Sequence, residues 1–341
     1  MTHTFPHDAV PRQTSIGRQP EPPSIEAVLP AAARALGEAL GRDPGDLRVV
    51  SGGRRTWSAT WELAAGTDRY MLKWLPRRAD RERELAQLSR RVFEGHAYIR
   101  TPRVACNPTP HTFLVEKLAG ASLHSVCTAP PVFGLSAWVD SRCALLERVG
   151  TWLNRFHAAA RQAQPAPLSG VKAYVLNREP ALAALEKEHV DEFWRMLDSA
   201  VAAAPVRVHG DFTPHNILVD GDTVAVIDMA GINEMECESH CFDAAAMTVG
   251  LEEAWRRRGR NYLRYVPAPV HRMIGAFLGS SGIDSDDAAL PVCYAVRHLT
   301  RVYNVLRTTG RRPGPRNWHV RRLRLAIERP EAIRALRSGH G

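Results

Sequence analysis

The stretch 206–228 constrains the fold of this 341-residue chain more than any other part of the sequence. It has the pattern of an apolar strand ending in His209-Gly210-Asp211, a proline-containing loop, and a second apolar strand, 224–227, ending in Asp228. Asn216 lies in the loop, so the spacing is H-G-D-x4-N-x11-D. We therefore expect Asp211, Asn216 and Asp228 to be presented at neighbouring strand ends.

These three side chains suit phosphoryl transfer from a magnesium nucleotide. Mg²⁺ takes a few protein oxygens in addition to phosphate oxygens, so Asn216 and Asp228 are the candidate metal ligands. A further carboxylate must orient the acceptor hydroxyl and accept its proton, and Asp211 is the candidate base. Gly210 permits the tight turn before it. The alternative is that both aspartates only mark hairpin turns, as Asp220-Gly221-Asp222 does.

His209-Gly210-Asp211, Asn216 and Ile227-Asp228 resemble the motifs of the aminoglycoside phosphotransferase and choline kinase-like family, the small-molecule branch of the protein-kinase-like fold. A weaker resemblance extends over about residues 45–310. It implies an α+β, bilobal fold with a small antiparallel β-sheet N-lobe and a larger, mainly helical C-lobe. It also implies ATP, or GTP, with Mg²⁺ as cofactors and a small-molecule hydroxyl as acceptor.

The periodicity of the chain agrees with two such lobes. Residues 1–23 have the composition of a disordered arm, 24–120 predict the nucleotide-binding lobe, and 121–341 predict the catalytic and substrate lobe. The first lobe begins with a helix that stops at Gly41. Strands are expected at 47–50, 57–63, 69–75 and 112–118, and helices at 80–93, 138–160 and 180–203.

The resemblance assigns nucleotide contacts in the predicted sheet. Gly52 and Gly53 would form a turn between the first two strands, where backbone N–H groups could approach phosphate. Lys73 would reach the α and β phosphates from the third strand as a point charge. The alternatives are a generic hairpin turn for the glycines and a solvated strand face for the lysine.

Four further positions follow from the resemblance. Glu84, on the charged helix, is favoured as the partner acid of Lys73 over Glu82, and an ordinary solvated charge is the alternative. Glu116 and Leu118 would lie in the hinge that binds adenine through backbone groups. His157, at the end of a helix, is expected to be structural.

The sequence departs from the family pattern after Asp228. Met229-Ala230 follow it, where an aromatic residue and then an acid or glycine are common in the family. The sequence therefore does not predict how the chain packs behind the candidate metal ligand Asp228. The loop 231–240 is acidic, and we interpret it as solvated, with contact to a cationic substrate as the alternative. Asp243 matches an aspartate that supports the catalytic loop.

The charge of the chain bears on the acceptor. Its formal net charge is +9, and residues from Val249 onwards hold 18 Arg, no Lys and 7 acids, a net of +11. Arginine suits phosphate or carboxylate, so we predict a neutral or anionic acceptor, such as a sugar. The alternative is that these arginines lie on solvated helix faces. An aminoglycoside or choline-like acceptor is a cation and would need an aromatic cage, for which Tyr262, Tyr265 and Trp318 are candidates.

The six cysteines are scattered over a long chain, so we expect reduced, mostly buried side chains. Only Cys237-Glu-Ser-His-Cys241 has the spacing of metal ligands, and the sequence has no second pair to complete a zinc site.

The sequence has no membrane span or signal-peptide core, which predicts a cytoplasmic protein. A module that binds nucleic acid or an anionic membrane would explain the basic C-terminus, but no zinc finger, RNP motif or basic heptad helix is present, and no nucleic acid is expected. A catalytically inactive kinase-like scaffold is a further alternative. The oligomeric state is open.

Overall fold

The computed structural model describes residues 21–41, 43–55, 58–76, 79–131, 133–161, 164–202, 205–229, 237–258, 268–284 and 287–339. The chain divides into two compact units, Met1–Ala79 with Ala105–Val115 and Asp80–Val104 with Glu116–Gly341. The predicted division at residue 120 therefore differs from the observed one. The charged helix belongs to the second unit, because its Leu85 and Phe93 join the core of that unit. The predicted arm lies outside the described residues up to residue 20.

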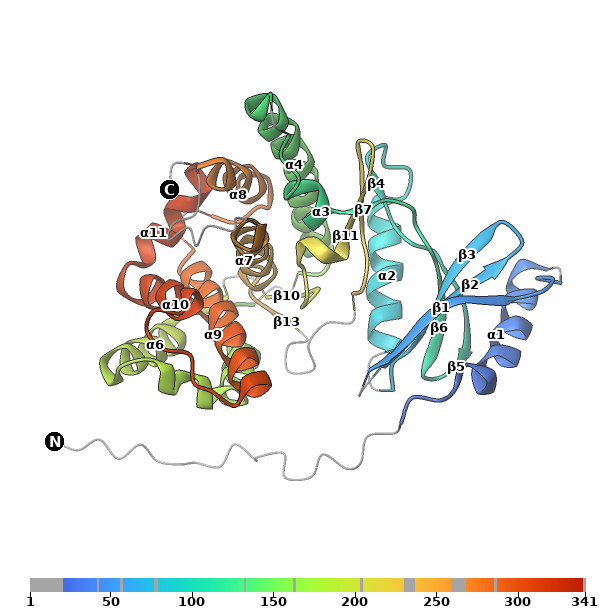
Figure 1. Cartoon of the computed structure of the whole chain (residues 1–341), viewed down its shortest axis with the longest axis horizontal. Helices are drawn as coiled ribbons and strands as arrows, with labels where there is room; N and C mark the ends of the chain where they lie inside the picture. The colour runs from blue at the N-terminus through green and yellow to red at the C-terminus, as the bar shows by residue number, and fades with distance from the viewer. Residues whose placement is uncertain are drawn as a thin grey trace. The chain divides into compact units, whose positions relative to one another are not determined.

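The first unit contains helix α1 (Ile25–Leu40) and an antiparallel sheet in the order β1-β2-β3-β6-β5 (Figure 1). The strands are β1 (Arg48–Arg55), β2 (Ser58–Ala65), β3 (Asp68–Trp74), β5 (Val104–Thr109) and β6 (Thr112–Glu116). Ser24 caps α1 by accepting from Ala27 N at 3.3 Å, and Gly41 ends it with a φ of 64°. Leu36 of α1 packs with Leu63 and Leu72 of the sheet. The α+β class and the antiparallel N-terminal sheet are confirmed.

The two glycines of the first strand do not form the predicted turn. Gly52 and Gly53 lie within β1, opposite Trp61 and Thr60 of β2. A Cβ on Gly52 would come within 2.2 Å of Trp61 Cδ1, so the indole ring requires a glycine there. Gly-Gly thus marks a close side-chain approach within a strand, which sequence alone cannot distinguish from a hairpin turn.

The second unit is mainly helical, as predicted. Its longest helix, α4 (Leu135–Ala159), packs against α8 (Ala268–Ser280). The predicted helix over 180–203 is divided into a 3₁₀ segment η1 (Glu179–Ala184) and α6 (Lys187–Ser199). The other helices are α2 (Ala79–Phe93), α3 (Leu123–Cys127), α5 (Ser169–Leu176), α7 (Cys241–Arg258), α9 (Ala289–Thr309), α10 (Trp318–Glu328), α11 (Pro330–Arg334) and the 3₁₀ segment η3 (Ala335–Ser338).

A small sheet of four strands, in the order β4-β12-β11-β7, contains the hairpin that follows residues 209–216. We call residues 209–216 the catalytic loop, after the role that the resemblance assigns to them, and the hairpin the catalytic-loop hairpin. The hairpin strands β11 (Ile217–Asp220) and β12 (Thr223–Val226) are joined by the predicted turn at Gly221, which has a φ of 57°. Their outer neighbours are β7 (Ala121–Ser122) and β4 (Ile99–Arg100).

The strand before His209 is shorter than predicted. It is β10 (Val206–Arg207), which pairs with β13 (Cys237–Glu238) and not with the hairpin. β8 (Ala166–Pro167) and β9 (Val201–Ala202) form a separate pair. The catalytic loop and the hairpin are therefore held together by contacts other than a shared sheet.

A cluster of buried aromatic residues packs against the catalytic loop. Phe212, the residue after Asp211, is fully buried and stacks on Trp152 of α4 at a centroid distance of 5.5 Å. Trp152 also stacks on Phe156 at 4.6 Å. The buried Phe212 anchors the chain immediately beside Asp211, whose own side chain is exposed. Among the described residues, no helix is long and apolar enough to cross a membrane.

Candidate active site

Asp211 and Asn216 are joined across the catalytic loop. Asn216 Nδ2 donates to Asp211 Oδ2 at 3.0 Å and to the Asp211 carbonyl oxygen at 2.9 Å. The loop closes through the 3₁₀ segment η2 (Pro214–Asn216), where Asn216 N donates to Thr213 O at 2.9 Å. The carboxylate of Asp211 is thus oriented by an amide and remains open to solvent, as a base for an incoming hydroxyl requires.

His209 connects this loop to the strand end that carries Asp228. Its Nδ1 accepts from Asp211 N at 3.3 Å, and its Nε2 faces Ile227 O at 3.0 Å, so Nε2 carries the proton and donates. Burial lowers the pKa of His209, which keeps the ring in this neutral form. Ile227 N donates in turn to Asn216 O at 3.0 Å. These bonds supply the connection that the sheet does not.

Asp228 has a φ of 59°, in the left-handed region that disfavours non-glycine residues. Its side chain is exposed, and the next residue, Met229, is buried. The strained backbone turns the carboxylate outward while Met229 fills the core. Met229 therefore supplies the apolar packing behind Asp228. Ala230 lies outside the described residues.

Asp243, at the start of α7, holds the main chain of the His-Gly-Asp segment. Its Oδ2 accepts from His209 N at 2.7 Å, and its Oδ1 accepts from Gly210 N at 2.8 Å. His157 Nε2 lies 3.0 Å from the same carboxylate and is itself buried. Burial alone would raise the pKa of Asp243, but the hydrogen bond and the charge of His157, together with the Gly210 N–H, hold it below its usual value. The expected supporting roles of Asp243 and His157 agree with these contacts.

Arg297 of α9 also holds the backbone of the His-Gly-Asp segment, a role that the sequence does not predict. Its Nη2 donates to Gly210 O at 2.8 Å, and its guanidinium lies 3.9 Å from the ring centroid of Phe242. The side chain is only 9% exposed. It is one of the 18 arginines from Val249 onwards whose number suggests an anionic acceptor. Its place in the apolar run 292–299 was the available signal that it is buried.

The donor set at the loop fits a hard cation. Both N–H groups of the Asn216 amide point to Asp211, so its Oδ1 remains as an acceptor. Asp228 adds an exposed carboxylate one residue beyond the Ile227–Asn216 backbone bond. An amide oxygen and a carboxylate are the oxygen ligands that Mg²⁺ prefers.

Lys73 lies on β3, opposite Thr60 of β2, and is 8% exposed. Its Nζ lies 5.8 Å from the centroid of Phe113, so the side chain runs along an aromatic ring and not along a solvated strand face. Glu84 is exposed, and its Oε2 accepts from Arg207 Nη2 at 2.8 Å. Glu82 is 4% exposed. Of the two glutamates, the one not favoured from sequence is the buried one.

The predicted hinge follows the end of β6. Glu116, the last residue of β6, is exposed, and its N–H donates to Arg103 O at 2.9 Å. Leu118 lies beyond the strand and is partly exposed. Gly120 has a φ of 135°, and a Cβ there would come within 2.8 Å of Val219 O. This glycine lets the chain pass directly over the catalytic-loop hairpin.

Glu238, from the acidic loop, is buried and not solvated. It is 2% exposed and accepts from Val171 N at 3.3 Å at the start of α5. Burial raises its pKa to about 7. The remaining acids of that loop, Glu234 and Glu236, lie outside the described residues.

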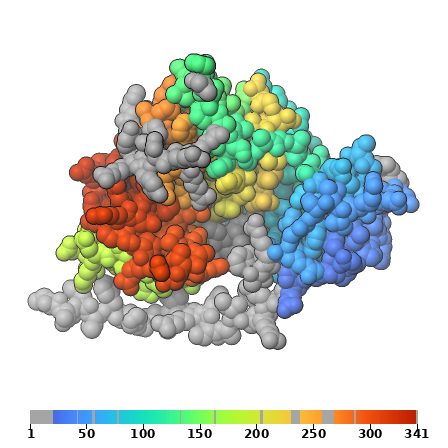
Figure 2. Space-filling view, viewed as in Figure 1, coloured from blue at the N-terminus to red at the C-terminus, as the bar shows by residue number. Residues whose placement is uncertain are grey.

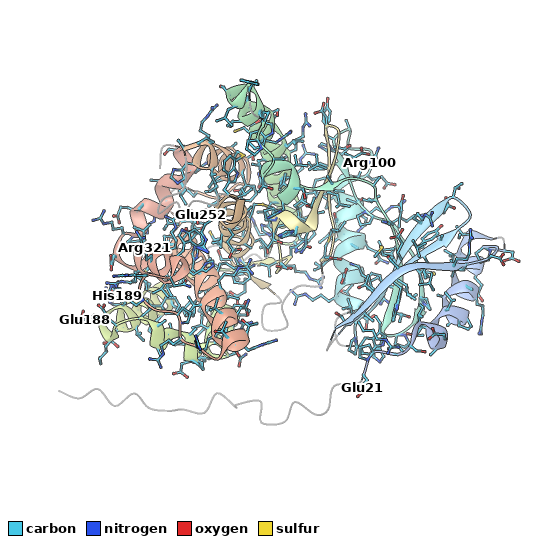
Figure 3. The ribbon with its side chains drawn as sticks, in the orientation of Figure 1. Glu21, Arg100, Glu188, His189, Glu252 and Arg321 are labelled. Carbon is cyan, nitrogen blue, oxygen red and sulfur yellow. The ribbon has the colours of Figure 1, made fainter. Side chains whose placement is uncertain are left out.

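Several C-terminal arginines bond to other groups of the protein. Arg322 Nη2 donates to Glu252 Oε1, and Arg301 Nη2 lies 2.9 Å from Glu253 Oε2. Figure 3 places Glu252 on α7 and Arg321 on α10, the helix that also carries Arg322. Arg324 lies 3.5 Å from Glu186. These three arginines are therefore paired within the protein, and two of their partners, Glu252 and Glu253, are already among the seven acids counted from Val249 onwards.

The surface of the last helices, orange to red in Figure 2, retains exposed arginines, among them Arg321. The proposed aromatic cage has little support among the described residues. Trp318 is 8% exposed and packs against His298 at 5.1 Å. Tyr262, Tyr265, Arg260 and Arg264 lie outside the described residues.

Three solved structures resemble the chain in fold. They are a glucosamine kinase in complex with glucosamine, ADP and inorganic phosphate (19% identity, TM-score 0.53, 87% of this chain and 80% of the other), the aminoglycoside phosphotransferase APH(4)-Ia in a ternary complex with AMP-PNP and hygromycin B (16%, 0.51, 91% and 99%), and choline kinase from Cryptosporidium parvum (12%, 0.50, 85% and 91%). The comparison with curated protein sequences gave no match.

A family model described as "Phosphotransferase enzyme family" matches residues 46–230. The match covers more than half of the chain and includes both the sheet of the first unit and the catalytic loop of the second. The protein-kinase-like fold expected from the sequence is confirmed by the structural likenesses. The chain thus belongs to the phosphotransferase enzyme family and is a small-molecule phosphotransferase.

Proposed function

We propose that the protein transfers the γ-phosphoryl group of ATP to a hydroxyl group of a small molecule, with Asp211 as the base. The observation that supports this most strongly is the orientation of the exposed Asp211 carboxylate by Asn216. The bonds from Asp243 and Arg297 to the main chain of the loop hold Asp211 in place. In this proposal Asp211 accepts the proton of the hydroxyl as its oxygen attacks the γ-phosphorus and ADP leaves.

Asn216 Oδ1 and the Asp228 carboxylate would hold Mg²⁺. When bound, the metal neutralises charge on the phosphate oxygens of the nucleotide. We propose that Lys73 contacts the α and β phosphates and that adenine binds along the segment of Glu116 and Leu118. Glu84 as the partner acid of the lysine stays a prediction, with the buried Glu82 as the competing candidate. A nucleotide role for Gly52 and Gly53 stays a prediction, and GTP remains the alternative donor.

For the acceptor we propose a sugar or amino-sugar hydroxyl. The arginines that suggested an anionic acceptor include Arg297, Arg301 and Arg322, and all three bond to protein groups. Glucosamine and hygromycin B, the small molecules in the complexes of two relatives, both carry sugar hydroxyls and amines. The alternatives are an aminoglycoside and a choline-like acceptor, and the screen described next includes both.

The test is a phosphotransfer screen with ATP and GTP against neutral sugars, amino sugars, aminoglycosides and choline. We expect Asp211→Ala to lower turnover by about 10²- to 10⁴-fold, because the base is lost, while the binding of Mg·ATP is kept. Asp228→Ala is expected to weaken Mg·ATP binding. Asp220→Ala is the matched control, since Asp220 lies in the same hairpin, at the end of β11, and pairs with Arg100 at the surface.

Turnover of Asp211→Ala at the wild-type rate would remove the assignment of the base. Absence of turnover in the wild type with every acceptor, together with intact Mg·ATP binding, would favour the inactive scaffold. Steeply salt-dependent DNA binding that survives Asp211→Ala would favour a binding module for anionic polymers.

A further inference from the structure

Three side chains that phosphotransfer does not use meet where α7 and α9 begin. They are His240, Cys241 and Asp287. Each offers one ligand atom, and the three atoms lie within 4.8 Å of one another. His240 Nε2 is 3.4 Å from Asp287 Oδ2. The helices that bring them together lie side by side in the second unit (Figure 1).

The three ligand groups are shielded from solvent. Cys241 is fully buried, and the side chains of His240 and Asp287 are 18% and 14% exposed. Among the described residues, the buried His240 Nε2 makes no hydrogen bond, although Asp287 Oδ2 lies 3.4 Å away. A buried ring nitrogen without a partner is unfavourable, and coordination to a cation would satisfy it.

We propose that His240, Cys241 and Asp287 bind a divalent transition-metal ion of the zinc type. Imidazole, thiolate and carboxylate together suit a borderline-soft cation, whereas Mg²⁺ takes oxygen ligands. Bond lengths of about 2.0–2.3 Å place neighbouring ligands of a tetrahedral ion about 3.3–3.8 Å apart. The His240–Asp287 pair already has that separation, and the other ligand atoms need to move closer by at most about 1 Å.

Three protein ligands leave a fourth position for water. Cys241 coordinates as the thiolate, so binding releases its thiol proton to solvent. The competing interpretation is a metal-free cluster in which the Cys241 thiol donates to Asp287 and His240 lies beside them. Both interpretations use the same atoms, but only the first predicts a stoichiometric sulfur–metal bond.

The position of the trio gives the ion a structural role. Cys241 lies two residues before Asp243, which holds the backbone of the catalytic loop. A bond from Cys241 through the metal to Asp287 would tie the start of α7 to the start of α9, the helix that also carries Arg297. The ion would therefore stabilise the frame of the site and take no part in the reaction.

The experiment uses the full chain, stripped of metal by a chelator and titrated with Co²⁺ in the presence of excess Mg²⁺ and without nucleotide. We expect one Co²⁺ per chain, a thiolate-to-cobalt charge-transfer band, and displacement by Zn²⁺ but not by Mg²⁺. Zn²⁺ should also raise the Tm, because it binds the native state.

Cys241→Ser and Asp287→Asn should each weaken Co²⁺ binding by more than about 100-fold, since even the outer partners of metal ligands change affinity by about 10- to 100-fold. Cys127→Ser, which alters another buried thiol, is the matched control and should bind as the wild type does. If Cys241→Ser does not fold, Asp287→Asn provides the same test, because asparagine retains hydrogen bonding.

A wild-type protein that shows no charge-transfer band and no rise in Tm with Zn²⁺ would overturn the proposal. So would a folded Cys241→Ser protein with the wild-type band. These readouts do not involve turnover, so they are independent of the outcome of the phosphotransfer screen.

Discussion

Asp243 and Glu252 lie on the same helix, α7, and both are buried, yet they bind different kinds of partner. Asp243 accepts from two backbone N–H groups of the catalytic loop. Glu252 accepts from side chains, Tyr294 Oη at 2.6 Å and Arg322. Backbone donors fix the path of the main chain, whereas side-chain donors on α9 and α10 fix the packing of helices. We infer that Asp243 serves activity first and Glu252 serves stability.

The two carboxylates share one electrostatic property. Burial would raise the pKa of each, but their partners lower it, with Arg322 the largest opposing influence on Glu252. A depressed folded-state pKa contributes stability above the unfolded values of 3.8 and 4.5, and that stability is lost as the pH falls below them. Acid alone therefore does not separate the two roles, and substitutions are needed.

The largest effect is expected from Asp243→Asn. The amide offers one oxygen where the loop and His157 use two, so one donor of His209, Gly210 or His157 loses its acceptor. We expect kcat to fall by on the order of 100-fold, equivalent to about 3 kcal/mol. Steady-state kinetics with the best acceptor measures this. A kcat within twofold of wild type would contradict the role given to Asp243.

Glu252→Gln is the matched change on the same helix. It leaves the charge of the partly buried Arg322 without its partner, so the free energy of unfolding should fall by about 3 kcal/mol. Urea unfolding measures the loss, and kcat per folded molecule should stay near the wild-type value. If Glu252→Gln lowered kcat as strongly as Asp243→Asn while stability held, the contrast between the two carboxylates would fail.

Arg297→Lys tests the frame from the opposite side of Gly210. A lysine can donate to Gly210 O but does not place a guanidinium over the Phe242 ring, so we expect kcat to fall about tenfold with little change in KM. Arg321→Lys, at an exposed position on α10, is the control and should have no effect. A change in KM with unaltered kcat would indicate contact with substrate instead of loop positioning.

Glu238→Gln extends the comparison to a buried carboxylate whose hydrogen-bond donors among the described residues are the backbone N–H groups of Gly170 and Val171. Burial raises its pKa from 4.5 to about 7, so its contribution to stability is complete below pH 4.5 and is lost as the pH rises through 7. The neutral variant should therefore match wild type at pH 4.5 and have a Tm higher by about 2–4 °C at pH 8. Thermal melts at both pH values test this, with the exposed Glu94→Gln as control. Equal Tm differences at both values would contradict the raised pKa.

Local sequence patterns predicted the elements whose contacts are near in sequence. The helix ending at Gly41, the strands of the first sheet and the Gly221 turn follow from periodicity and turn residues. The His-Gly-Asp spacing predicted the loop, because Asp211 and Asn216 bond across only five residues. Asp243 was also indicated, but only through resemblance to a family.

What sequence could not predict depends on partners distant in the chain. Gly52 required Trp61 from the next strand, and the burial of Glu82 instead of Glu84 is decided by the rotation of α2 in its packing. Arg297 donates to Gly210, which lies 87 residues away in the chain. The number of arginines in the C-terminal segment could not reveal that contact.

The sequence by itself determined the reactive groups and their local order, because those follow from residue types a few positions apart. The tertiary structure decided which charged side chains bond to groups of the protein and which are exposed to solvent. It buried Arg297 and Arg322 against the protein's own acceptors, held Asp243 under the loop, and brought Asp287 to Cys241. The physical reason is that burial and pairing set the energy of a charge, and both depend on helices that meet only after the chain has folded.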